Sequence, residues 1–148
     1  LRYRLKDPYF RFWFRFTEPA TAQALAERQQ WSLLKALFED SWENFSGLTL
    51  EDWFRESYLA SGDWTQVGSW WDKKGENEID LVAVNSLTKT LEIVEVKRNR
   101  KKYNPDLLAH KIRLFHNTCA RFIGGYEVLS PKCLSPEDML KVTKSFDD

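Results

Sequence analysis

The chain has 148 residues, and its 22 Lys and Arg residues balance its 22 Asp and Glu residues, so its formal net charge at pH 7 is zero. A chain of this length is enough for one domain and can bury about 70% of its unfolded surface without help from a metal ion or disulfide. No run of residues approaches the roughly 20 apolar residues of a membrane span, so we expect no membrane partner. The two cysteines lack the spacing of a zinc site, which favours free thiols and a cytoplasmic location.

The first third of the chain predicts two helices. Asp7-Pro8 favours a helix start, and residues 9–16 follow with aromatic side chains nearly all round, which indicates packing partners on several sides. Thr17-Glu18-Pro19 interrupts this helix, and residues 20–44 have the apolar spacing of a long helix. We therefore assign residues 1–45 to an N-terminal helical segment, consisting of an aromatic docking helix and a long helix.

A second segment, residues 46–148, has the pattern of an α/β (α+β) core. Phe45-Ser46-Gly47 predicts the end of the long helix, and Thr49 with Asp52 predicts a capping box for a helix that reaches residue 60. Strands are predicted at 64–72, with a weak point or bulge at Gly68, and at 78–84 and 91–97; a helix at 106–117, a bent strand or strand pair at 121–129 and a short last helix follow. We expect a mixed central sheet flanked by helices.

The two middle strands carry charged residues at matching positions. If their hairpin closes around the turn residues 85–89 so that the numbers of opposed residues sum to 175, Val82 lies opposite Ile93, and Asp80 lies opposite Glu95. The same register places Glu78 opposite Lys97. Directly opposed side chains have Cβ atoms roughly 4.5–5.5 Å apart, which lets two carboxylates share one cation.

Two interpretations of this charged end remain open. Charged residues at a strand end are ordinary surface chemistry, worth a few tenths of a kcal/mol per cross-strand pair. Alternatively, Asp80 and Glu95 form a site, because both lie in apolar runs and opposed carboxylates repel unless a proton or cation lies between them. Glu51 borders the apolar stripe of the preceding helix and can point towards the same sheet.

Cations follow the second of these strands. Such a run is usually a solvated loop, but here it leaves the strand that carries Glu95, so it can neutralise phosphates beside the site. Lys111 lies on the packed side of the next helix, where a lysine usually extends its ammonium group to solvent; a phosphate contact is the alternative. The predicted phosphate-binding residues are Arg98, Arg100, Lys101, Lys102 and Lys111.

A carboxylate on the second strand and Glu-x-Lys on the third resemble the PD-(D/E)XK nuclease superfamily, whose fold is a restriction-endonuclease-like core. The matching residues are Asp80, Glu95 and Lys97, with Glu51 at the position of an extra helical acid. Ile79 stands where the superfamily name has proline. The resemblance implies Mg²⁺ (or Mn²⁺) held by Asp80, Glu95 and Glu51, catalysis by Asp80, Glu95 and Lys97, and hydrolysis of phosphodiester bonds in nucleic acid, with DNA as the expected substrate.

A narrower resemblance covers nearly the whole chain. The segments 3–16, 67–72 and 78–84, together with Glu95-Val96-Lys97, are similar to the C-terminal domain of archaeal-type, AAA+-like ATPases, a domain-of-unknown-function family. It implies an ATPase and a winged-helix region as partners in the same full-length protein, and we interpret this chain as one compact domain cut from it. We favour an enzyme. The alternatives are a catalytically silent module that docks the ATPase or a second copy through its aromatic helix, and nucleic-acid binding without cleavage.

Overall fold

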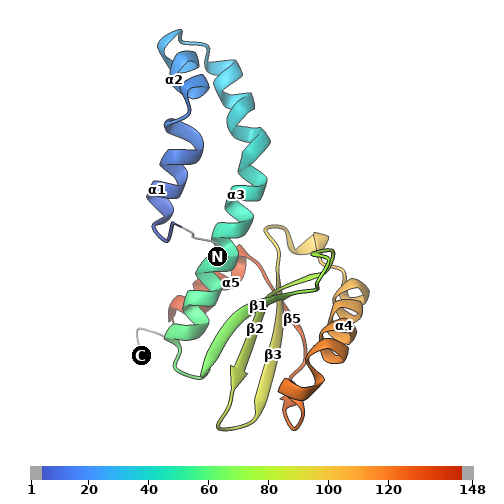
Figure 1. Ribbon diagram of the computed structural model, residues 1–148. Helices are drawn as coiled ribbons and strands as arrows, with labels where there is room; N and C mark the ends of the chain where they lie inside the picture. The colour runs from blue at the N-terminus through green and yellow to red at the C-terminus, as the bar shows by residue number, and fades with distance from the viewer. Residues whose placement is uncertain (1–4, 145–148) are drawn as a thin grey trace. The chain divides into compact units, whose positions relative to one another are not determined.

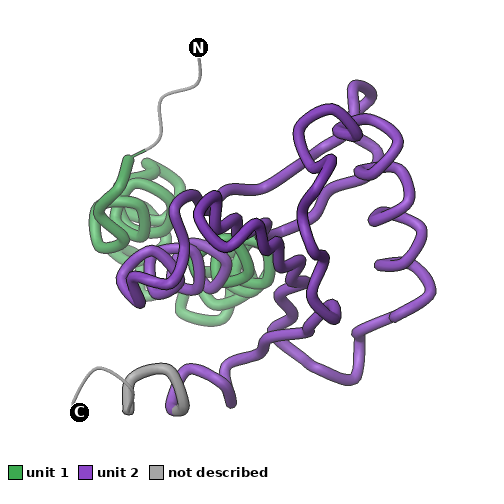
Figure 2. The backbone as a smooth tube through the Cα atoms, turned by 90° about the horizontal axis from the view of Figure 1, so that it is seen from below, with its two compact units in different colours: residues 1–49 green, residues 50–148 purple. Residues whose placement is uncertain are grey.

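The computed structural model describes the backbone of residues 5–144 and the side chains of residues 5–140. The chain divides into two compact units, Leu1–Thr49 (unit 1) and Leu50–Asp148 (unit 2), which Figure 2 colours separately. Within the described part of the chain, no helix has the length and apolar character needed to cross a bilayer. The two units are described in turn.

Unit 1 is built from helices, and its first helices start where the sequence predicts. Helix α1 (Pro8–Phe12) has Asp7 as its N-cap, whose carboxylate accepts hydrogen bonds from the backbone N–H groups of Tyr9 and Phe10 at 2.8 and 3.1 Å. It continues as a π-helical turn, η1 (Trp13–Thr17). Helix α2 (Ala20–Glu27) follows.

Helix α3 (Trp31–Ala60) differs from the prediction at both ends of the proposed long helix. A break at residues 28–30, with Gln29 at φ 57°, separates α2 from α3. The predicted break at residues 45–47 is wrong, because the helix is continuous there. The hydroxyl of Thr49 donates to the carbonyl of Phe45 at 2.9 Å, so it bonds within the helix instead of capping a new one. Asp52 pairs with Arg55 at 2.9 Å.

Aromatic side chains form the interior of unit 1. Neighbouring ring centroids lie 4.7–6.2 Å apart in this cluster, within the range of favourable aromatic pairs. Its members are Phe12, Phe16, Phe38, Trp42 and Phe45. Phe12 and Phe16 of the first helix are half-buried in this cluster, whereas Tyr9, Phe10, Trp13 and Phe14 are exposed.

Unit 2 contains the predicted mixed sheet. Strands β1 (Gln66–Trp71), β2 (Glu78–Asn85) and β3 (Thr90–Val96) pair antiparallel in that order, and β3 also pairs in parallel with β4 (Glu127–Val128) and β5 (Lys132–Leu134). The predicted hairpin register is confirmed by the pairs Val82–Ile93 and Val84–Leu91. The register between β1 and β2 shifts between Gly68 and Trp70, which confirms the bulge.

Helices cover both faces of this sheet (Figure 1). Helix α4 (Pro105–Ile123) packs Leu108 and Phe115 against one face, which Val82, Val84, Leu91 and Ile93 line. The last ten or so residues of α3 pack against the other face through Leu50 and Phe54, where the sheet contributes Leu81, Ala83, Val94 and Val96. The mixed α/β class with flanking helices is thus confirmed.

The C-terminal half of unit 2 differs from the prediction. Asn104 caps α4 as expected, but α4 continues to Ile123, past a kink at Cys119, so the predicted strand at 121–129 is reduced to β4. The sequence pattern also missed β5, which lies beyond Pro131. Helix α5 (Pro136–Lys144) starts where predicted, with the Asp138 carboxylate accepting from the backbone N–H of Ser135 at 2.9 Å.

Candidate active site on the central hairpin

The hairpin of β2 and β3 brings Asp80 and Glu95 to one end of the sheet in unit 2. Leu81 pairs with Val94, and the same register places the preceding Asp80 opposite Glu95. Asp80 is 9% exposed, and its Oδ2 accepts a hydrogen bond from the backbone N–H of Val96 at 2.7 Å. The predicted juxtaposition therefore exists, and a cross-strand hydrogen bond fixes Asp80 within it.

Glu95 is held by two lysines. The residue is only 3% exposed, and its Oε1 accepts from Lys97 at 2.8 Å and from Lys111 at 2.9 Å. Lys111 also reaches Oε2 at 3.1 Å. The predicted pairing of Lys97 with Glu78 does not form, because Lys97 turns back to Glu95 within its own strand end and Glu78 is exposed.

The charges of this group shift one another's pKa values. Burial raises the pKa of Asp80, the charge of Glu95 raises it further, and the Val96 hydrogen bond and the two lysines oppose this. Burial is the largest single influence on the pKa of Lys97 and lowers it, but the hydrogen bond to Glu95 and the charges of Glu95 and Asp80 together outweigh burial and leave that pKa above its ordinary value. Lys97 is therefore a cation in this site.

Glu51 joins the group from α3. Burial and the charge of Asp80 raise the pKa of Glu51 from 4.5 to about 7, although Arg55 on the same helix opposes the shift. The Arg55 guanidinium lies 3.6 Å from the Glu51 carboxylate. Glu51 therefore lies near enough to Asp80 for the two charges to interact.

The carboxylates of this group suit a divalent cation, but one of them, Glu95, already contacts two lysines. Glu51, Asp80 and Glu95 offer carboxylate oxygens, the ligands that Mg²⁺ prefers. In the described residues, however, no three His, Cys, Asp or Glu side chains surround a common point as they would around an ion. Glu95 is turned towards Lys97 and Lys111, so it would have to release one ammonium group to become a ligand.

The predicted phosphate-binding residues separate into two groups. Arg98, Lys101 and Lys102 are exposed in the segment after β3, where a short 3₁₀ turn, η2 (Arg100–Lys102), forms. Arg100 and Lys111 contact carboxylates of unit 2. Arg100 donates to Asp138 at 2.6 Å and to the carbonyl of Cys133 at 2.9 Å, which ties the segment to α5 and β5.

Sequence reasoning named Lys111 but missed its contact with Glu95, and it missed Arg55 altogether. Lys111 lies four residues after Leu107 and four before Phe115, which places it on the packed side of α4. The buried Glu95 carboxylate needed a cationic partner, so the contact of Lys111 with Glu95 could have been inferred. Arg55 lies four residues after Glu51 on one helix, a spacing that brings opposite charges together.

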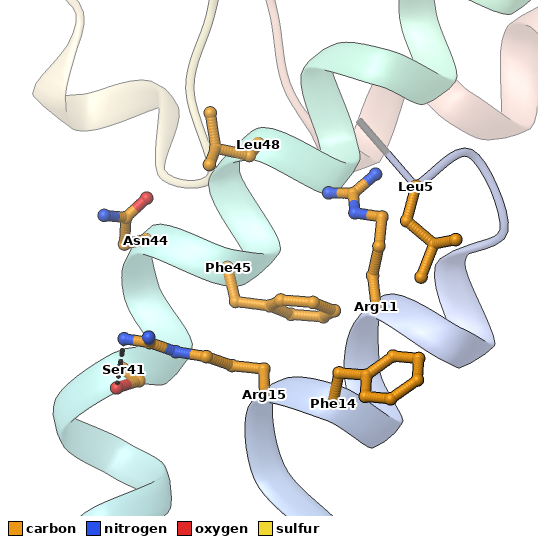
Figure 3. A pocket seen from close by; sticks show the side chains of 8 residues that line it. All are labelled: Leu5, Arg11, Phe14, Arg15, Ser41, Asn44, Phe45 and Leu48. Carbon is orange, nitrogen blue, oxygen red and sulfur yellow. Dashed lines mark hydrogen bonds between the residues drawn. The ribbon is translucent and has the colours of Figure 1, made fainter. Parts of the chain in front are cut away.

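A separate pocket lies in unit 1, between α1–η1 and α3 (Figure 3). Its volume is about 490 Å³, and the ring of Phe45 projects into it from α3. Arg11 places its guanidinium 5.7 Å from the centre of that ring, and Arg15 donates to the Ser41 hydroxyl at 2.8 Å. This pocket contains no acidic residue among the eight that line it, so any ligand would meet two cations and apolar surface.

Comparison with known proteins places part of this chain in one family. Residues 13–107 match the model of a family described as archaeal and bacterial proteins of unknown function (DUF234). The matched range includes Glu51, Asp80, Glu95 and Lys97 and ends before Lys111. Neither the curated proteins nor the solved structures contain a match to the chain.

Proposed function

The chain belongs to this family of archaeal and bacterial proteins of unknown function, and we propose that unit 2 is a metal-dependent nuclease module of the PD-(D/E)XK type. The observation that carries the proposal is the convergence of Asp80, Glu95 and Lys97 at one end of the hairpin, with Glu51 beside them. DNA is the substrate we propose, and the C-terminal part of an ATP-binding protein is the proposed setting.

Each residue has a proposed role. Asp80 and Glu51 would hold Mg²⁺ or Mn²⁺ with their carboxylates. Glu95 would become a third ligand once it had released one of its two lysine contacts. The bound ion supplies a polarised phosphoryl oxygen and a bound water of lowered pKa. Lys97 would donate hydrogen bonds to the attacking water or to the charge that develops on phosphorus. Arg98, Lys101 and Lys102 would neutralise the neighbouring phosphates.

Burial supports this proposal over an ordinary surface pair. Asp80 and Glu95 are 9% and 3% exposed, whereas surface ion pairs of little energetic value are solvated. Burying two carboxylates side by side costs free energy, which a protein recovers when the pair has a cationic partner. A buried carboxylate with a raised pKa, such as Asp80, is typical of functional sites.

A cleavage assay with paired variants tests the proposal. Purified protein should nick or cut DNA with Mg²⁺ or Mn²⁺, and EDTA should abolish the reaction. Asp80→Ala and Lys97→Ala should each reduce the rate at least about a hundredfold, since both act on the reacting phosphate. Lys73→Ala, in the exposed turn between β1 and β2, provides the control. Equal cleavage by all these proteins would point to a contaminating nuclease and refute the assignment.

The aromatic surface of unit 1 favours a second function, a silent interaction module that docks the ATPase. Tyr9, Phe10 and Phe14 are half or more exposed, at 63%, 50% and 57%, which is unusual for such large apolar side chains. The pocket beside them presents Arg11 and Arg15. This function predicts that the chain binds the ATPase region tightly, and that Phe10→Ser with Phe14→Ser abolishes binding without lowering the melting temperature.

A further inference from the structure

A pocket in unit 2 lies on the opposite face of the sheet from Glu95. Glu92 and Glu95 are three residues apart on β3, so their side chains project from opposite faces. Glu92 is on the face covered by α3 and borders a pocket of about 390 Å³. The pocket is lined by Ser57, Tyr58, Ser61, Asp63, Trp64, Glu92 and Lys132. The proposed nuclease chemistry uses none of these residues.

Glu92 is an unusual residue for this face. Its partner across the hairpin is Ala83, and the neighbouring positions on the same face are the apolar Leu81 and Val94. Glu92 is nevertheless only 3% exposed. A buried carboxylate lowers stability unless a cation and hydrogen-bond donors compensate it. Glu92 therefore calls for an explanation other than packing.

The pocket already contains an ammonium group from its own chain. Lys132, on β5, places its Nζ 2.5 Å from Oε1 of Glu92, and the Tyr58 hydroxyl donates to the same oxygen at 3.4 Å. A carboxylate can accept about four hydrogen bonds, so further donors can be accommodated. The Lys132 side chain is 54% exposed, which allows it to leave the pocket without disturbing the core.

The remaining lining suits an organic cation. Without Lys132, the charged groups are the carboxylates of Glu92 and Asp63. The rings of Tyr58 and Trp64 form a wall, stacked with centroids 6.1 Å apart and an interplanar angle of 21°. Aromatic faces attract alkylammonium groups, and burial keeps the pKa of Tyr58 raised, so its hydroxyl remains a donor.

We propose that this pocket binds the alkylammonium group of an organic amine, which takes the place of Lys132 against Glu92. The free amine and the side chain of a lysine or methyl-lysine in a peptide share this chemistry. Lys132 then acts as an internal competitor, so removing it should strengthen binding. This proposal is independent of whether the Asp80 site cleaves nucleic acid.

Calorimetric titration of the whole chain with n-butylamine at neutral pH tests the site, with 1-butanol as the uncharged analogue. Parallel titrations with trimethyl-lysine and with Nα-acetyl-lysine amide, which keeps its side-chain ammonium group, show whether a peptide side chain binds more tightly than the free n-butylamine. We expect saturable amine binding and none of the alcohol. Glu92→Gln should weaken binding at least about tenfold, and Trp64→Leu at least about threefold, through loss of the carboxylate and the aromatic wall.

Lys132→Met, compared with Lys73→Met, isolates the competition. Both substitutions remove one positive charge from unit 2, but Lys73 is in an exposed turn outside the pocket. We expect Lys132→Met to tighten amine binding at least about threefold and Lys73→Met to change it less than twofold. Equal effects of the two substitutions, or absence of saturation by about 20 mM amine, would overturn the proposal. If circular dichroism shows that Glu92→Gln does not fold, the comparison of Lys132→Met with Lys73→Met alone tests the proposed amine site.

Discussion

Lys111 of α4 donates hydrogen bonds to both oxygens of Glu95 on β3, at 2.9 and 3.1 Å. The lysine side chain is 13% exposed and the carboxylate side chain 4% exposed, so the pair is largely removed from water. This contact joins a helix to the strand end that carries the candidate site. It also gives Glu95 a second cation besides Lys97.

We predict that Lys111→Met destabilises the protein by about 2–3 kcal/mol, because it leaves a buried carboxylate with one cation in place of two. The second substitution Glu95→Gln should restore most of this loss, since it removes the unpaired charge. Urea unfolding of the wild type, the two single variants and the double variant measures the coupling. The exposed Lys101→Met is the control. Additive effects of the two substitutions would show that the pair is not coupled.

The stability of the metal-free protein should depend on the charge of Glu51. The pKa of Glu51 is about 7 in the folded protein and 4.5 without the surrounding structure. The folded state therefore binds more protons between these values, and its free energy of unfolding should fall as pH rises from about 4.5 to about 7. At pH 8, we expect Glu51→Gln to be more stable than the wild type by on the order of 1 kcal/mol. Thermal melts at pH 5 and pH 8 measure this difference, and an identical difference at the two pH values would contradict it.

We predict that Arg100 contributes to stability, whereas its neighbours Arg98 and Lys101 contribute to DNA binding. Arg100 contacts Asp138 and the carbonyl of Cys133, so Arg100→Ala should lower stability by about 1–2 kcal/mol. Arg98→Ala and Lys101→Ala should leave the melting temperature unchanged and weaken DNA binding, with a shallower dependence on salt. Binding titrations at several salt concentrations, paired with thermal melts, distinguish the two groups. A DNA-binding loss confined to Arg100→Ala would reverse this assignment.

The hairpin could be predicted because its information is local. Apolar alternation and a short turn, four residues long at 86–89, determine the pairing of Val82 with Ile93, and that register brings Asp80 to Glu95. Gly68 likewise predicts its bulge, because a glycine inside a strand weakens regular pairing. The position of Lys97 within reach of Glu95 follows from alternation along one strand.

The errors arise where a local signal fits two structures or where a long-range contact decides the structure. Ser46-Gly47 and Thr49 are helix-end signals, yet the hydroxyls of Ser46 and Thr49 bond to the preceding turn and α3 continues. Strand β5 is short and gains its order from pairing with β3, a long-range contact that no local pattern announces. The ion pair of Arg100 with Asp138 is also a long-range contact, so it could not be inferred without the positions of β5 and α5.

The central claim is that Asp80 belongs to a divalent-cation site, and calorimetric titration with Mn²⁺ and Mg²⁺ tests it most directly. We predict saturable binding by the wild type, at least about tenfold weaker binding by Asp80→Ala, and tighter binding by Lys111→Met, which removes a competing ammonium group from Glu95. Circular dichroism must first show that the variants are folded. Absence of saturable binding in the wild type and in folded Lys111→Met, or equal affinity of the wild type and Asp80→Ala, would contradict the account.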